Sequence, residues 1–297
     1  MCLLTQTTLT CRGQSARPHT FTPMKRKSRS ATRLTSARGS RIRGEAVISL
    51  QVGMSTHVGM ARSENQDCPG MFPADPAEPA PRGRLFVVAD GMGGHRAGAT
   101  ASSLAVQTLS DVFYSSSAPH TVERLQEALL QANKVIYQLG TSDRAFSGMG
   151  TTCSALVIAG DAVVFGHVGD SRIYRITRKA IEQVTDDHSR VGELVRRGII
   201  TKEQARVHPE RSLLYRALGA RESAEVDVAE IDPLHSSCWF LLCSDGLTNH
   251  VTDPELQSLI LSKPPAEAAS ALVEFANQRG GSDNITVIVV RATVSQP

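Results

Sequence analysis

TTCSALVIAGDAVVFGHVGDSRIYRI, residues 151–176, is the stretch that decides the fold class. It holds three apolar segments rich in β-branched residues, separated by Gly-Asp at 160–161 and by Gly-Asp-Ser at 169–171. Turns this short join antiparallel neighbours, because parallel strands need a crossover of about a dozen residues or more. The stretch therefore predicts a three-stranded antiparallel meander.

The rest of the chain adds strands and helices to this meander. Apolar runs predict four further strands, at residues 46–56, 84–90, 238–246 and 284–293. Helix-start signals and apolar residues at three- and four-residue steps predict helices at residues 97–113, 121–139, 253–261 and 265–278. Because strands and helices do not alternate one by one, a doubly wound parallel sheet is disfavoured. We expect an α+β fold in which helices flank two antiparallel sheets, with a polar, charged lobe inserted at residues 186–222.

The N-terminal segment differs in composition from the remainder. Residues 1–44 contain ten of the 32 Lys and Arg residues and no Asp or Glu, which leaves 22 basic against 29 acidic residues, a balance of −7, in the rest. The segment is rich in Ser and Thr and lacks hydrophobic periodicity, so we expect a disordered tail over residues 1–45. Three interpretations remain: a solvated tail or an upstream start site, with Met24 or Met54 as later starts; an organelle transit peptide; or a segment that binds nucleic acid or acidic membrane.

The cysteines and the lengths of the apolar stretches indicate the cellular compartment. The cysteines show no zinc-type spacing, and they are Cys2, Cys11, Cys68, Cys153, Cys238 and Cys243. Three of the later ones lie inside apolar runs, as reduced core residues of an intracellular protein do. No apolar stretch reaches the roughly 18 residues of a membrane helix. We expect a cytoplasmic monomer with no membrane span.

Five aspartates stand at the boundaries of apolar segments: Asp67, Asp90, Asp170, Asp245 and Asp283. Each alone is typical of a turn, since Asp-Gly, Gly-Asp and Asp-Asn are common turn pairs. Strand ends that face the same edge of a sandwich would, however, bring several carboxylates together. Like charges at that range raise one another's pKa unless a cation neutralises them. Oxygen ligands favour Mg²⁺, Mn²⁺ or Ca²⁺, and the lack of a Cys or His cluster disfavours zinc.

Seven segments follow one another along the chain: VGMARSENQD, VVADGMGGHRAG, GMGTTCSALVI, GHVGDSRIYRI, DDHSRVGELVRRG, SDGLTNHV and GGSDNITVIVV. In this order they resemble the metal-dependent, type 2C Ser/Thr protein phosphatases, most of all their single-domain bacterial branch. The resemblance runs from about residue 50 to 292. It implies an αββα sandwich of two antiparallel sheets, in a phosphatase domain over residues 46–297 with a flap at about 186–222.

The resemblance also implies a centre of two metal ions, Mn²⁺ or Mg²⁺, at one edge of the sandwich. Asp90 would bridge both metals, the carbonyl of Gly91 would bind one of them, and Asp245 and Asp283 would complete the other. A glycine suits position 91, because no side chain blocks the approach of a metal ion to its backbone carbonyl. Asp67 would act mainly through bound water.

Asp170 and Arg62 complete the implied site. Asp170 matches the position linked in this family to a third, weaker metal. Arg62 falls where the family places an arginine that clamps the substrate phosphate, and a guanidinium fork suits phosphate better than lysine does. The implied reaction is hydrolysis of phosphoserine and phosphothreonine in proteins, by in-line attack of a hydroxide that the two metals share. Asp90 and Arg62 would be its catalytic residues.

Three positions depart from patterns in other branches of the family. Met92 stands where many eukaryotic relatives have a histidine proposed as general acid, Gln66 where a glutamate is common, and Asn249 where an acidic residue lies near the third metal. His188 and His208, in or beside the inserted lobe, are interpreted as surface histidines.

The implied partners are phosphorylated proteins, the targets of a cognate Ser/Thr kinase. One alternative is a weakly active or inactive relative that serves as a regulatory binding module, which replacement of the aspartates would favour; all five are present. The other is a nucleic-acid-binding protein led by its basic tail. That alternative predicts basic clusters or stacking aromatics in the folded part, which is net acidic in a chain with only 4% aromatic residues, so no nucleic acid is expected there.

Overall fold

The computed structural model of the chain describes residues 47–75, 78, 80–94 and 96–295. The expected tail over residues 1–45 therefore lies outside the described residues. From Val47 onward the described residues belong to one compact unit.

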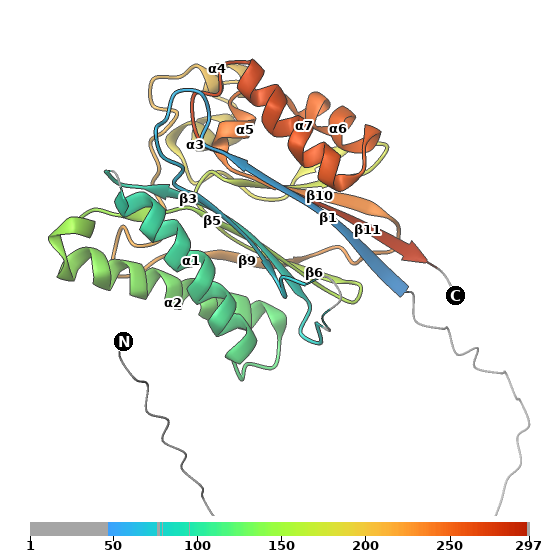
Figure 1. Ribbon diagram of the computed structural model, residues 1–297, viewed down its shortest axis with the longest axis horizontal. Helices are drawn as coiled ribbons and strands as arrows, with labels where there is room; N and C mark the ends of the chain where they lie inside the picture. The colour runs from blue at the N-terminus through green and yellow to red at the C-terminus, as the bar shows by residue number, and fades with distance from the viewer. Residues whose placement is uncertain (1–46, 76–77, 79, 95, 296–297) are drawn as a thin grey trace, which may run out of the picture. The chain divides into compact units, whose positions relative to one another are not determined.

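Two antiparallel sheets form the centre of the unit (Figure 1). The first sheet has the order β1 (Val47–His57), β11 (Ile285–Ser295), β10 (Cys238–Cys243), β7 (Arg172–Ile176) and β8 (Ile181–Gln183). The second has the order β2 (Asp67–Phe72), β3 (Arg84–Met92), β5 (Cys153–Ala159), β6 (Ala162–Val168) and β9 (Asp227–Ile231), with β4 (Gly150–Thr151) paired to β3. The α+β sandwich expected from the sequence is confirmed.

Helices cover the outer face of each sheet. Figure 1 shows one group beside the second sheet and another beside the first. The first group consists of α1 (Arg96–Ser115) and α2 (Thr121–Ser142), followed by the short η1 (Arg144–Phe146). The second consists of α5 (Asp245–Thr248), α6 (Asp253–Ser262) and α7 (Pro265–Gln278). Between β8 and β9 lie α3 (Arg190–Arg196) and α4 (Lys202–Arg206), in the predicted flap.

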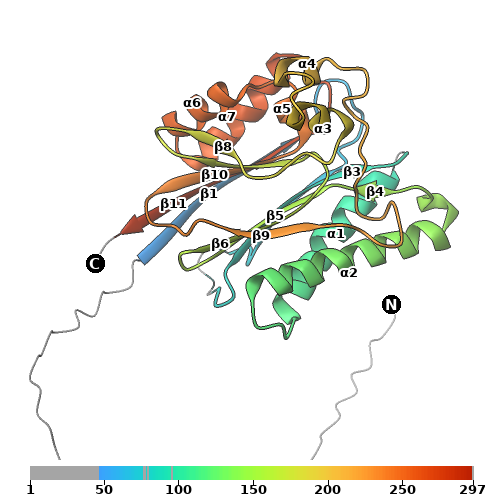
Figure 2. The same ribbon diagram turned by 180° about the vertical axis from the view of Figure 1, so that it is seen from behind.

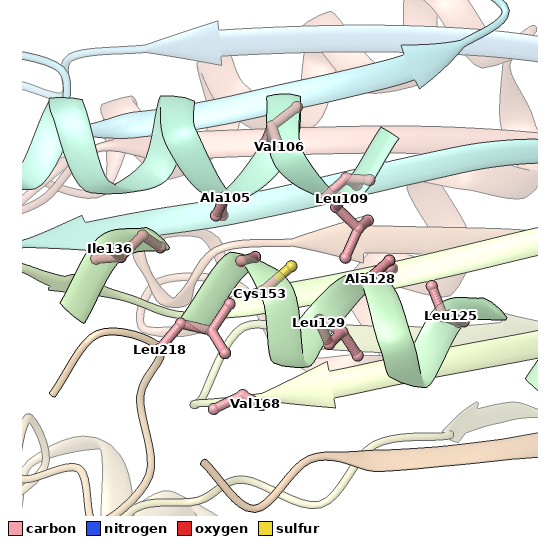
Figure 3. Close-up of a cluster of buried hydrophobic side chains, with 14 of the residues drawn as sticks. Ala105, Val106, Leu109, Leu125, Ala128, Leu129, Ile136, Cys153, Val168 and Leu218 are labelled. Carbon is pink, nitrogen blue, oxygen red and sulfur yellow. The ribbon is translucent and has the colours of Figure 1, made fainter. Parts of the chain in front are cut away.

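The hydrophobic core has three layers, because each sheet buries both faces. One cluster lies between the sheets, and the other two lie between a sheet and its helices. Helix α2 illustrates the outer layers: Leu125, Leu129 and Ile136 are fully buried on one face, toward the second sheet and α1 (Figure 3). Full burial of each such side chain contributes roughly 1.5–3 kcal/mol. The 3.6-residue period that predicted this helix therefore also predicted its packed face.

The predicted meander is wrong at its third strand. β5 and β6 form the expected hairpin, but the other edge of β6 pairs with β9, and β7 pairs with β10 and β8 in the first sheet. Gly169 takes φ +113°, a conformation that favours glycine. Ser171 is then fixed by a 2.7 Å hydrogen bond between its Oγ and Thr152 Oγ1. The turn at 169–171 thus carries the chain between the sheets and puts Asp170 where they meet.

Strand β3 also runs further than its sequence indicates. Asp90 does not end it, because Gly91 and Met92 continue the strand and pair with Thr151 and Gly150 of β4.

Among the described residues, none of the helices has the length and apolar character needed to cross a membrane.

Candidate metal centre

The second sheet places two of the predicted aspartates side by side. Asp67 begins β2 and is the direct antiparallel partner of Asp90 in β3. Opposite residues of such a pair project to the same face with Cβ atoms about 4.5–5.5 Å apart, and like charges there are destabilising. Asp67 is buried, and its Oδ2 accepts a 2.8 Å hydrogen bond from the hydroxyl of Ser244 at the end of β10. Strands of both sheets therefore meet at this carboxylate.

The first sheet contributes Asp245 and Asp283 from neighbouring strands. Asp245 is the first residue of α5, directly after β10, and Asp283 comes two residues before β11, which pairs with β10. Asp245 Oδ2 accepts a 3.1 Å hydrogen bond from the side-chain amide of Asn249, one helical turn on. Gly246 is required next to it, because a Cβ there would stand 2.0 Å from the carbonyl oxygen of Asn284.

The pKa values place these carboxylates in one electrostatic group. Burial raises the pKa of Asp67 to about 7, with the charges of Asp245 and Asp283 acting in the same direction against the hydrogen bond from Ser244. The pKa of Asp90 lies well above its usual range, through burial first and the charge of Asp67 second. Burial and the charge of Asp245 also raise the pKa of Asp170. The raised pKa values of Asp67, Asp90 and Asp170 therefore each depend in part on the charge of Asp245.

Two buried carboxylate oxygens indicate what this group can bind. In the described part of the chain, Asp67 Oδ1 and Asp245 Oδ1 are among four buried side-chain polar atoms without a hydrogen-bond partner. No three His, Cys, Asp or Glu side chains of the described residues are gathered into a ready-made metal site. Coulombic coupling reaches further than coordination does, so the two observations are compatible. Anionic oxygens without partners are the donors that hard divalent cations prefer, and the residues fit such ions.

Gly91 has a packing role that its sequence position does not reveal. Its N–H donates a 3.1 Å hydrogen bond to the carbonyl of Gln66, and a Cβ on it would lie 2.0 Å from the carbonyl oxygen of Gly98 in α1. A Cβ on Gly98 would in turn come within 2.9 Å of the Gly91 carbonyl oxygen. Gly98 therefore keeps that oxygen accessible. The sequence alone predicts no role for Gly98, although this residue lies in the glycine-rich segment that opens α1.

Arg62 lies against one of the predicted cation ligands. Its Nη2 is 2.8 Å from Asp283 Oδ2, and the two side chains are 56% and 30% exposed. The loop that carries Arg62 is held by Asn284, whose side-chain amide donates to the carbonyls of Val58 and Glu64 at 2.9 and 3.0 Å. Sequence reasoning missed this second role of the Asp-Asn pair, for which the only signal was an amide next to a candidate ligand.

The interpretation of His188 as a surface residue is wrong. His188 is buried, its backbone N–H donates to the carbonyl of Gly169 at 2.7 Å, and its Nδ1 accepts from the Gly169 N–H at 3.2 Å. The proton therefore sits on Nε2, which donates to Asp227 Oδ2 at 2.9 Å. Burial lowers the pKa of His188, which favours this neutral form. The histidine joins the base of the flap to the turn that carries Asp170, whereas His208 is half-buried.

Comparison with known proteins gives a consistent result. The family model described as Protein phosphatase 2C matches residues 72–285. The chain is 42% identical over 246 residues to the serine/threonine phosphatase stp of Listeria monocytogenes serotype 4b (strain F2365), covering 81% of this chain and 95% of that protein. The crystal structure of the Mycobacterium tuberculosis serine/threonine phosphatase PstP/Ppp matches with a TM-score of 0.72 at 33% identity, over 82% of this chain and 98% of that one. The PstP catalytic domain in complex with two manganese ions matches with a TM-score of 0.71 at 31% identity, over 83% and 100% of the two chains.

Proposed function

The chain belongs to the protein phosphatase 2C family and is a metal-dependent serine/threonine phosphoprotein phosphatase, and from that premise we propose which of its residues carry the reaction. The observation that supports the assignment is the coupled carboxylate group, in which Asp67 and Asp245 each have a buried oxygen without a partner. The relatives, which are named phosphatases, do not favour the alternative of an inactive regulatory module.

Asp90, Asp245 and Asp283 are the proposed direct ligands of two divalent cations, with the Gly91 carbonyl as a further donor and Asp67 acting through bound water. Mn²⁺ and Mg²⁺ are the proposed ions, because the donors are all oxygen atoms and because the related PstP domain was solved with two manganese ions. Bound there, the cations would supply an activated water at neutral pH and neutralise phosphoryl charge.

Asp170 is the proposed ligand of a third, weaker ion. Asn249, at a position where the family resemblance implies an acidic residue, donates to Asp245 and adds no negative charge beside Asp170. We expect this ion to bind less tightly than the other two for that reason.

Arg62 is the proposed clamp for the substrate phosphate. Its present partner, Asp283, is also a proposed cation ligand. If Asp283 coordinates a cation, the exposed guanidinium of Arg62 becomes available to pair with a phosphoryl oxygen in a charge-assisted hydrogen bond. The pair thus links cation binding to readiness for substrate.

The proposed division of the chain is a catalytic domain over residues 46–297, with a flap at about 186–222, and a separate segment over residues 1–45. Phosphoproteins modified by a cognate Ser/Thr kinase are the proposed substrates, for a monomeric enzyme in the cytoplasm. The free thiols of Cys153, Cys238 and Cys243, all buried, support a reducing compartment.

Hydrolysis of a phosphothreonine peptide and of p-nitrophenyl phosphate tests the proposal, each with Mn²⁺, with Mg²⁺ and with EDTA. Both substrates should be hydrolysed only when a divalent cation is present. Activity that survives exhaustive chelation would contradict the two-cation assignment, and activity on the small ester without any on the peptide would contradict the protein substrate.

A further inference from the structure

A cavity of about 200 Å³ lies between the flap and the candidate metal centre. Asp170 and Asp245 form part of its lining, whereas Arg62, Asp67 and Asp90 do not belong to it. Figure 1 and Figure 2 agree that α3 and α4 lie beside α5, the helix that begins at Asp245. The cavity is therefore a neighbour of the catalytic site with one shared wall. Its volume is well above the roughly 10–15 Å³ that one water needs.

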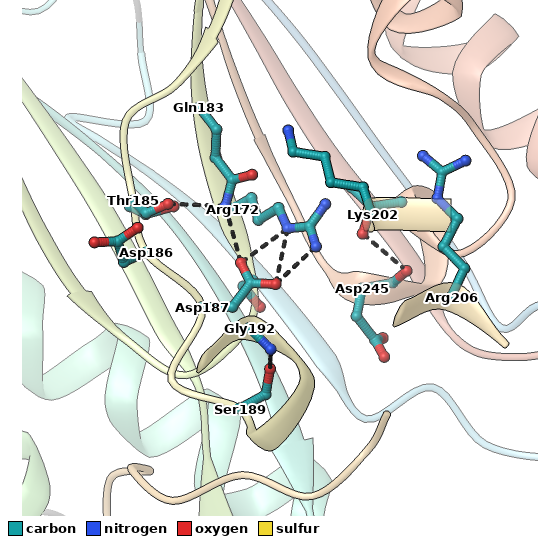
Figure 4. Close-up of polar contacts among 12 residues, drawn as sticks. Arg172, Gln183, Thr185, Asp186, Asp187, Ser189, Gly192, Lys202, Arg206 and Asp245 are labelled. Carbon is teal, nitrogen blue, oxygen red and sulfur yellow. Dashed lines mark hydrogen bonds and ion pairs between the residues drawn. The ribbon is translucent and has the colours of Figure 1, made fainter. Parts of the chain in front are cut away.

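The wall formed by β7 and the start of the flap is already neutralised. Arg172 Nε and Nη2 bind the two oxygens of Asp187 at 2.9 and 2.7 Å, and Gln183 donates to the same carboxylate at 2.9 Å. Figure 4 shows this pair on one side of Asp245 and Arg206 on the other. In such a bidentate pair the two charges neutralise each other and two N–H donors of the guanidinium are already used. An anionic ligand would therefore gain little from binding to Arg172.

The flap wall is different, because its positive charges lack carboxylate partners. Arg196 donates to the carbonyl of Asp187 and to the Tyr215 hydroxyl, each at 2.8 Å. Among the described residues, the Arg206 side chain donates only to the Val251 carbonyl, at 3.2 Å. The Arg211 side chain makes no hydrogen bond or ion pair with any other residue that the structure describes.

Lys202 is the exception among the basic residues of this wall, since it pairs with Asp253 at 2.8 Å. Three guanidinium groups, those of Arg196, Arg206 and Arg211, thus line the cavity without an ion-pair partner among the described residues. An ordinary solvated basic face would be convex and would scatter such groups. Here all three belong to the lining of one concave space.

We propose that this cavity binds a second anionic group of the phosphoprotein, close in sequence to the phosphoresidue that is hydrolysed. The inference rests on the proposed function and specifies its substrate class: phosphosites with a neighbouring carboxylate or phosphate. Guanidinium forks match both groups through paired N–H donors. Because an extended chain advances at most about 3.3–3.6 Å per residue, a cavity that shares a wall with the site is reached within about three positions.

Four phosphothreonine peptides test this with the full chain and Mn²⁺: one with alanine flanks, one with glutamate, one with phosphoserine and one with lysine within three positions. If the cavity binds a second anionic group, kcat/KM on the glutamate or phosphoserine peptide should exceed kcat/KM on the alanine peptide by about tenfold, which corresponds to about 1.4 kcal/mol. The larger of the two ratios identifies carboxylate or phosphate as the preferred group. Equal values on all four peptides would overturn the proposal.

The variant Arg206→Gln/Arg211→Gln should bring the acidic-to-alanine ratio close to one, and Arg211→Glu should shift the preference toward the lysine peptide. Arg144→Gln, an exposed arginine in η1 outside the cavity, should keep the wild-type ratio. Thermal unfolding of each variant shows whether it is folded. An unchanged ratio in both flap variants would refute the assignment. Wild type that hydrolyses no peptide, with or without Mn²⁺, would refute the proposed function instead.

Discussion

Replacement of Asp90 by asparagine should change activity and stability in opposite directions. Asp90 lies directly opposite Asp67 on the neighbouring strand, and the charge of Asp67 helps to raise its pKa. Without cations the two carboxylates repel each other, so the folded protein gains when one charge is removed. With cations the same charge would serve as a proposed ligand. Asp90→Asn should therefore stabilise the metal-free protein and inactivate the enzyme.

Both magnitudes follow from the geometry. Two unit charges about 5 Å apart interact by roughly 3 kcal/mol at an effective dielectric constant of about 20. Protonation relieves part of this repulsion at neutral pH, so the free energy of unfolding of the metal-free variant should rise by about 1–3 kcal/mol. Asparagine keeps the shape of the side chain but loses one good oxygen ligand and the charge. Turnover should fall at least roughly 10³-fold, or about 4 kcal/mol in activation free energy.

Urea unfolding in EDTA at pH 7, calorimetric Mn²⁺ titration and turnover on p-nitrophenyl phosphate measure the three effects. Asp161→Asn is the matched control, because Asp161 is exposed in the β5–β6 turn and its backbone carbonyl, not its side chain, accepts the 2.8 Å hydrogen bond from the Leu234 N–H. The control should be nearly silent in all three assays. A metal-free Asp90→Asn that unfolds more easily than wild type, or one that keeps wild-type Mn²⁺ stoichiometry and turnover, would refute the reasoning.

Three further predictions concern other parts of the chain. Arg62→Ala should cost about 2–4 kcal/mol in kcat/KM and leave Mn²⁺ affinity intact or higher, because Asp283 loses a competing partner; loss of Mn²⁺ binding in calorimetry would make Arg62 structural. In EDTA, the free energy of unfolding of wild type minus that of Asp67→Asn should decrease by about 2–4 kcal/mol as pH rises from 4 to 7. The reason is that the Asp67 carboxyl has a pKa of about 7 in the folded protein against its ordinary 3.8, so it keeps its proton to higher pH than in the unfolded chain. Burial lowers the pKa of His167 to about 4, so this residue makes the free energy of unfolding rise with pH, but it does so equally in both proteins and cancels in the difference. A difference that does not change with pH would contradict the raised pKa of Asp67. Deletion of residues 1–44 should leave turnover and thermal stability nearly unchanged, and a large loss of either would show that the segment belongs to the domain.

The elements that the sequence predicted well are those with a strong periodic signal. Helix α7 was predicted at residues 265–278 and is found at Pro265–Gln278, with Leu272 and Val273 buried as expected. In contrast, β2 and β9 were missed. β9 reads DVAEI and has no fully buried residue, so its pairing is decided by the free edge of β6 and not by its own composition.

The errors at β7 and at His188 have a common cause, since both depend on contacts between segments far apart in the sequence. A short Gly-Asp turn indicates a change of direction, but it does not say whether the next strand pairs with the last one or crosses to another sheet. His188 is polar in a polar segment, and only its hydrogen bonds to Gly169 and Asp227, 19 and 39 residues away, make it a buried anchor. Local composition contains neither fact.

The site prediction rests on a different signal, and the assignment of these aspartates as cation ligands stays a proposal. A carboxylate after or before an apolar run costs stability where packing buries it, because its charge must then leave water or face other charges. Asp90 from the second sheet and Asp245 from the first are placed in that position by strands that pack face to face. Each sheet alone could turn its charged end to solvent. Together they cannot, and a cation held between them would offset the repulsion and join the two layers at one edge. The charge that the packing penalises is therefore the one that the proposed chemistry would use.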